Sequence, residues 1–205
     1  MKNDSQPTSL DEGAGLITTL LSNLTGPDAR MWLEAFKLFL KKKNPWTDRV
    51  ENLWKSILVG GKSAEKLMKE LLEKGFKLGD YAKSMTNHKQ FTTSRNSKKV
   101  DFAKKSLKEF GFTGKTFGEL LDFFRNHPLY ELSQPEDVYY LRLAYTDQPK
   151  GEWVRLAMET IPGSDGGPGV FGLERDGGDL WLGGGWYGPA REVDRDGLWF
   201  VRLRK

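Results

Sequence analysis

Apolar residues recur with a helical period in the first two thirds of the chain. One set lies between Pro27 and Asn44-Pro45. Its members are spaced i, i+3, i+4, i+7 and i+8: Trp32, Ala35, Phe36, Phe39 and Leu40. A second set has the same spacing behind a candidate cap at Ser63: Ala64, Leu67, Met68, Leu71 and Leu72. This spacing places each set on one face of an α-helix. We expect further helices over residues 16–24, 101–110 and 117–127, the last behind a Thr-x-x-Glu capping box.

Two segments between these helices are less periodic. Residues 53–59 form a short apolar run that fits either a strand or a helix, followed by Gly60-Gly61. Residues 84–100 are mostly polar and have no period, which is typical of a loop or linker. Residues 1–13 have a disordered composition.

From about Tyr139 the period changes to two. Short runs rich in β-branched and aromatic residues alternate with Gly, Pro and Asp, which indicates antiparallel strands. The expected strands are 139–145, 153–158, 170–175, 180–182 and 198–203. We therefore predict an α+β protein, in which an α-helical N-terminal part precedes an antiparallel β meander or small barrel of about five strands. The expected divisions are a disordered N-terminus (1–13), a basic helical part (14–130) and a Gly/Trp-rich β part (131–205); whether the last two share one core stays open.

Composition excludes several classes of site. The 205 residues contain no cysteine, so there is no disulfide, no thiolate nucleophile and no Cys-based metal centre. The polar start has no apolar segment of a signal peptide, and no apolar run approaches the ~18–20 residues of a membrane span. We accordingly expect a cytoplasmic protein that makes no membrane contact.

The net charge of +4 is distributed unevenly. Residues 1–130 carry 23 Lys and Arg against 15 Asp and Glu, whereas residues 131–205 carry 9 against 13. A basic helical part can be a solvated surface, or it can bind phosphates. The second interpretation makes the protein a nucleic-acid-binding protein, and its candidate residues are Lys41, Lys42, Lys43, Arg49, Lys98, Lys99, Lys104 and Lys105.

One string of the β part resembles a known group of sequences. Residues 141–153 read Leu-Arg-Leu-Ala-Tyr-Thr-Asp-Gln-Pro-Lys-Gly-Glu-Trp, and the helix from Trp32 to Pro45 and the closing Trp199-Phe200-Val201-Arg202 are similar too. They resemble an uncharacterised family of "hypothetical proteins" in small-genome bacteria. The resemblance implies a small stand-alone bacterial protein and brings no activity with it.

Candidate catalytic and ligand-binding motifs are incomplete. Gly61-Lys62-Ser63 has the end of a phosphate-binding loop, but Ser56 stands where that motif has glycine, so a turn and helix cap explain it better. His88 and His127 lie in a polar loop and at a helix end, and the Asp/Gly pairs near 176 and 194 are typical of hairpin turns. We predict no catalytic, cofactor or metal residues; an enzyme of unrecognised type remains the third alternative.

Aromatic residues are the main functional feature of the β part. Trp153, Trp181 and Trp199 are expected in the core of the sheet. Trp186 and Tyr187 lie in a Gly/Pro-rich stretch and can present their rings to a partner. The favoured hypothesis is therefore a small non-enzymatic binding or interaction module that contacts a partner, such as another protein, through Trp186 and Tyr187.

Overall fold

The structure is a computed structural model that describes residues 10–26, 29–40 and 52–204. The chain divides into two compact units, residues 1–50 and 51–205. The first unit contains two helices that contact each other, α1 (Leu10–Thr25) and α2 (Ala29–Leu40). Among the described helices, none combines the length and the apolarity that crossing a membrane requires.

The second unit contains the rest of the described structure. Its helices are α4 (Ala64–Glu73), α5 (Asp80–Asn87), α6 (Phe117–Arg125) and α7 (Asp137–Ala144). Its longer strands are β1 (Lys55–Val59), β3 (Lys98–Ser106), β5 (Trp153–Leu156), β7 (Pro168–Asp176), β8 (Asp179–Trp186) and β9 (Leu198–Leu203). Its two-residue strands are β2 (Lys77–Leu78), β4 (Tyr130–Glu131) and β6 (Ile161–Pro162).

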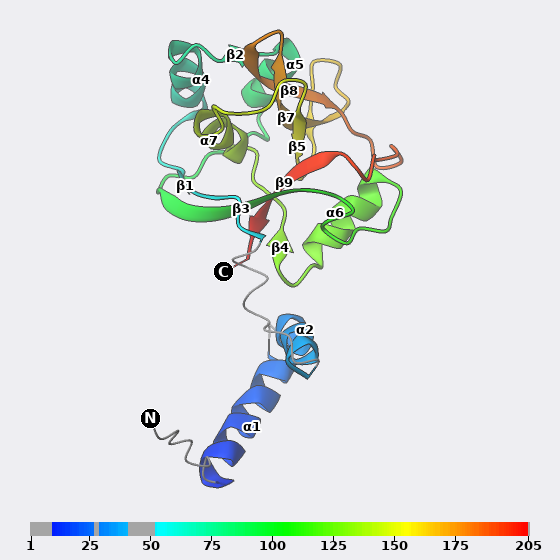
Figure 1. Cartoon of the computed structure of the whole chain (residues 1–205). Helices are drawn as coiled ribbons and strands as arrows, with labels where there is room; N and C mark the ends of the chain where they lie inside the picture. The colour runs from blue at the N-terminus through cyan, green and yellow to red at the C-terminus, as the bar shows by residue number, and fades with distance from the viewer. Residues whose placement is uncertain (1–9, 27–28, 41–51, 205) are drawn as a thin grey trace, which may run out of the picture. The chain divides into compact units, whose positions relative to one another are not determined.

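These strands form one nine-stranded mixed sheet, which curls (Figure 1). Its main path runs β1-β3-β9-β5-β7-β8-β2, while β4 pairs with β9 and β6 with β7. Two pairs are parallel, β5 with β9 and β2 with β8. The α+β class is confirmed, but the expected antiparallel meander of about five strands is wrong, because strands from both halves of the chain enter one sheet.

Two expected elements have the opposite type. Residues 98–106 form strand β3 rather than a helix, with Val100 and Phe102 buried at alternate positions. Residues 137–144 form helix α7 rather than a strand, and Asp137 to Arg142 are all buried. A helix buried on every side shows no amphipathic stripe, so the apparent period of two in 139–145 was accidental. Residues 53–59 are resolved in favour of strand, as β1.

Both halves of the second unit share one core. Antiparallel pairing of β3 with β9 joins residues on either side of the expected boundary at 130/131, which is therefore not a division between separate cores. Helices α4, α5 and α7 gather on one side of β3 and β9, and α6 lies on the other (Figure 1). Phe200 of β9 packs against Trp54 and Tyr145 on the α7 side, and its neighbour Trp199 stacks on Phe117 of α6. We call the side that carries Trp199 the outer face.

The Asp-Gln-Pro-Lys-Gly-Glu-Trp string attaches α7 to the sheet. Gln148 is fully buried: its Oε1 accepts from Arg142 of α7 at 2.5 Å, and its Nε2 donates to the carbonyl oxygens of Glu152 and Leu173. Glu152 accepts from Tyr145 and Lys104 at 2.5 and 2.9 Å. The string therefore has a structural role in this fold.

Candidate functional site

Strand pairing places two rows of residues across the outer face, because paired residues lie on the same side of a sheet. The first row crosses four strands: Trp153, Glu174, Trp181 and Lys77. The second row crosses five: Lys105, Trp199, Arg155, Gly172 and Gly183. Helix α6 packs on the Trp199 part of this face. We call the part over β5, β7 and β8 the glycine face, defined by Trp153, Arg155, Gly172, Glu174, Trp181, Gly183 and Gly185.

Strand β8 contains three successive glycines whose surroundings differ. A Cβ atom at Gly184, on the inner side, would come within 3.3–3.4 Å of Met85, Tyr81 and the Val170 carbonyl. A Cβ at Gly185 would meet nothing within 4 Å, and one at Gly183 only the Glu174 carboxylate at 3.7 Å. Neither outer glycine has a positive φ. Packing against the described residues and backbone conformation therefore do not explain glycine at 183 and 185, although glycine costs roughly 0.5–1 kcal/mol relative to alanine in a strand.

Trp153 borders this bare stretch of backbone. It is 39 % exposed, contrary to the expectation that its ring lies in the core. Its indole Nε1 lies over Gly172, where a Cβ atom would come within 2.5 Å of it. The ring can therefore pack against the strand only because residue 172 has no side chain. Trp181 stands in the same row two strands away and is half-buried. The glycine face thus presents partly exposed backbone at Gly183 and Gly185 next to aromatic surface.

Arg155 places a positive charge among these rings. Its guanidinium carbon lies 4.4 Å from the Trp153 ring centroid, 5.8 Å from Trp199 and 6.0 Å from Tyr187. Among the described residues it has no carboxylate partner, and its buried Nε has no hydrogen-bond acceptor. Aromatic faces stabilise a guanidinium only partly, because a partly buried cation also loses hydration. Arg155 is therefore available to a negatively charged group from outside the chain.

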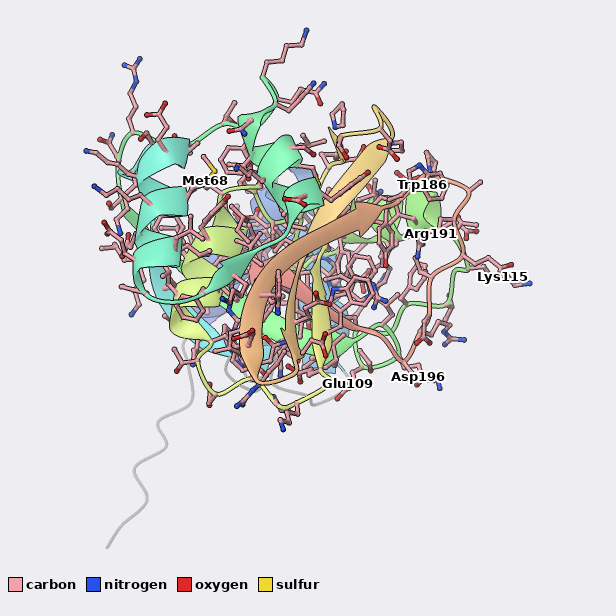
Figure 2. All side chains as sticks on the ribbon, turned by 90° about the horizontal axis from the view of Figure 1, so that it is seen from above. Met68, Glu109, Lys115, Trp186, Arg191 and Asp196 are labelled. Atoms are coloured by element: carbon pink, nitrogen blue, oxygen red, sulfur yellow. The ribbon has the colours of Figure 1, made fainter. Side chains whose placement is uncertain are left out.

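The two aromatic residues expected to contact a partner have different environments. Trp186 is 46 % exposed at the end of β8, beside Arg191, whose guanidinium carbon lies 5.9 Å from its ring (Figure 2). Tyr187 is 3 % exposed and packs edge-on against Phe117 and Trp199. Tyr187 is thus a core residue in this fold, which corrects the expectation that both rings are displayed. The strand period continues to Tyr187, so the ring falls on the outer face under α6.

Of the residues proposed for nucleic-acid binding, the structure describes four, and it places Lys98 and Lys99 beside one cavity but Lys104 and Lys105 on opposite faces of β3. Lys41, Lys42, Lys43 and Arg49 lie outside the described residues. Lys98 and Lys99 are exposed at the start of β3. Lys104 is half-buried and bonded to Glu152 and Tyr145, while Lys105 is on the outer face and donates to Asn52. Because alternate residues of β3 point to opposite faces, Lys104 and Lys105 cannot share one phosphate-binding surface.

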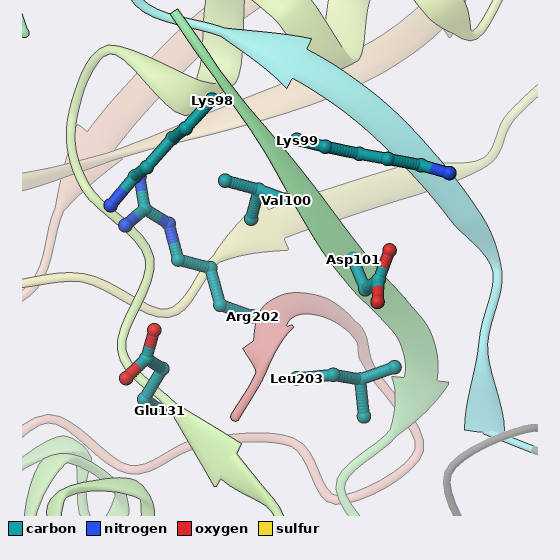
Figure 3. Close-up of a pocket in the computed structure, with 7 residues that line it drawn as sticks. All are labelled: Lys98, Lys99, Val100, Asp101, Glu131, Arg202 and Leu203. Atoms are coloured by element: carbon teal, nitrogen blue, oxygen red, sulfur yellow. The ribbon is translucent and has the colours of Figure 1, made fainter. Parts of the chain in front are cut away.

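A cavity of about 220 Å³ opens between β3, β4 and β9 (Figure 3). Its lining residues are Lys98, Lys99, Val100, Asp101, Glu131, Arg202 and Leu203. Arg202, at its floor, donates from Nε and Nη2 to the two carboxylate oxygens of buried Asp137, each at 2.7 Å. Arg202 is thus paired with a buried carboxylate, whereas Lys98 and Lys99, like Arg155, have no ion-pair partner among the described residues.

Other candidate motifs have structural explanations. Lys62 pairs with Glu70 and Ser63 caps α4, so Gly61-Lys62-Ser63 forms a turn and helix cap. His127 is half-buried against Phe123 and Tyr130, and its Nδ1 accepts from the Leu129 amide at 3.1 Å. Within the described part of the chain, no three His, Asp or Glu side chains are grouped as metal ligands would be.

Comparison with known proteins adds no relative: no family model, no curated protein and no solved structure matches this chain. The glycine face is therefore assessed from its own geometry alone.

Sequence reasoning missed most of this face. Residues 183–189 resemble a Gly/Pro loop, so the strand was expected to end at Leu182, whereas β8 continues to Trp186. A period of two over the whole strand places Trp181, Gly183 and Gly185 on one side, and that was the available signal. Arg155 carried no such signal, because whether a carboxylate of the described residues pairs with it depends on tertiary contacts.

Proposed function

We propose that this protein is a non-enzymatic binding module whose contact surface is the glycine face. The observation that carries the proposal is the partly exposed backbone of Gly183 and Gly185, where no close contact with the described residues excludes a side chain. Glycine within a strand is typical of places where a ligand or another backbone approaches closely. Two residues of the same surface support a binding role: exposed Trp153, and Arg155, which has no carboxylate partner among the described residues.

The test uses Gly185→Val, which adds a side chain to the middle of the face. Immobilised wild-type protein and the variant are each incubated with bacterial lysate, and bound protein, nucleic acid and glycan are quantified separately. Ser56→Val is the matched control, since it adds the same side chain to an exposed position of edge strand β1. We expect one bound species to be lost with Gly185→Val and kept with Ser56→Val. Equal retention by all three proteins would refute the proposal.

Trp186→Ala tests the position of the surface. The Trp186 ring packs on Gly167 and Gly188, where added Cβ atoms would come within 2.8 and 2.6 Å of it. These contacts within the chain account for the position of the ring. We expect capture to survive Trp186→Ala. Loss of capture with Trp186→Ala and not with Gly185→Val would move the contact surface to the end of β8.

A further inference from the structure

We infer that the occupant of the glycine face is a single-stranded nucleic acid, an inference that rests on the proposed function and names its ligand. The first argument is stacking. Trp153 and Trp181 are aligned in one row on alternate strands, which are roughly 10 Å apart. Bases of a single strand stack on such rings without sequence preference, whereas the bases of a duplex are already stacked on each other.

The second argument is charge complementarity. Arg155 stacks on Trp153 and has no carboxylate partner among the described residues, so a phosphate would supply the missing anion. Exposed Lys77 ends the first row and adds a cation beside Trp181. Glu174, between the two tryptophans, can accept a hydrogen bond from an exocyclic amino group of a base.

The third argument is shape. Nothing among the described residues lies within 4 Å of the position that a Cβ at Gly185 would occupy, so an extended strand of nucleotides can approach the backbone there. An acidic peptide would also suit Arg155, but it would leave the two aligned tryptophans without stacking partners. A glycan would stack on tryptophan without needing the unpaired cation. A single-stranded nucleic acid fits this combination best, because its bases can stack on the rings and its phosphates can pair with the cations.

The experiment measures fluorescence anisotropy of labelled single strands of about 12 nucleotides, as DNA and as RNA, within the ~4–16 nucleotides of known single-strand sites. Full-length protein is titrated at ~50 and ~200 mM salt, with unlabelled duplex as competitor. We expect binding that weakens steeply with salt and resists duplex competition. Tighter binding of DNA or of RNA would identify the preferred sugar, and tighter binding of either supports the inference.

Two variants locate the binding. Trp153→Ala should weaken binding by about 5- to 100-fold, because one stacked base is lost. Arg155→Gln should weaken binding and lower the slope of log K against log salt by about 1, the loss of one phosphate contact. Arg95→Gln, the same charge change at an exposed loop position, should keep both affinity and slope.

Three results overturn the inference. They are no binding of either single strand at ~50 mM salt, equal affinity of Trp153→Ala and wild type, and an unchanged salt slope in Arg155→Gln. If lysate capture of a protein or glycan still depends on Gly185, only the ligand class is wrong and the proposed function stands. If capture is also independent of Gly185, both are wrong.

Discussion

At the scale of single residues, glycines that look equivalent in sequence have different roles. Gly169 on β7 is buried against α5, and an added Cβ would come within 2.8–3.2 Å of Tyr81, Met85 and the Ile161 carbonyl. Gly185 lies on the opposite side of the sheet with open space above it. Only the first is required by packing, and the sequence does not distinguish the two, since the difference lies in contacts with residues far along the chain.

Valine at these two positions should change the free energy of unfolding in opposite directions. Gly185→Val removes a flexible residue from a strand and should leave stability unchanged or raise it by up to about 1 kcal/mol. Gly169→Val should lower it by about 1–3 kcal/mol, because the new side chain overfills the contact with α5. Urea unfolding of both variants checks this; destabilisation by Gly185→Val as large as by Gly169→Val would mean that the fold needs both.

His127 should make stability depend on pH. Burial, and the nearby charge of Arg204, lower the pKa of His127 to about 4, whereas it is about 6.5 in an unfolded chain. The unfolded state therefore takes up the proton first, and stability falls as pH decreases from about 6.5 toward 4. Because the ring is partly exposed, we expect a loss of about 1–2 kcal/mol between pH 7 and 5.

The control for this pH effect keeps the acceptor at the same place. His127→Gln should flatten the pH dependence between 7 and 5. Unfolding midpoints measured at each pH give the comparison. A pH profile of His127→Gln that follows the wild type would show that other groups cause the loss.

At the scale of elements, sequence patterns were informative where one face meets solvent. The helices α4 and α6 were predicted from their apolar stripes and caps, and the Thr116–Glu119 capping box is present. Helix α7 was not, because its buried surface includes Asp137 and Arg142 as well as apolar side chains. Their partners, Arg202 and Gln148, come from other elements, so the local pattern could not reveal why these charges are buried.

Gln148 should contribute more to stability than its size indicates. Gln148→Ala removes one acceptor of Arg142 and the donor to two carbonyl groups, leaving buried polar groups without partners. We expect a loss of about 2–4 kcal/mol in urea unfolding. Gln90→Ala, at an exposed position, should stay within about 0.5 kcal/mol of the wild type. A loss below 1 kcal/mol for Gln148→Ala would contradict the structural role of the string.

At the scale of the whole molecule, the class could be predicted and the topology could not. The boundary expected at 130/131 followed the change in glycine and tryptophan content, yet β3, which precedes it, pairs with β9, which follows it. Such long-range pairing leaves no local trace in a single sequence. The same is true of the glycine face, which combines Trp153 and Arg155 of β5 with Gly172 of β7 and Gly183 of β8.

The most direct test of this face is a map of backbone amide chemical shifts during titration with the single strand that binds best. We predict that the largest chemical-shift changes occur at Trp153, Gly172, Gly183 and Gly185, because the bound bases and phosphates would contact the strands at these residues. Changes confined to Lys98, Lys99 and Glu131 around the cavity, or to Trp186 and its neighbours, would contradict the account and place the binding surface elsewhere.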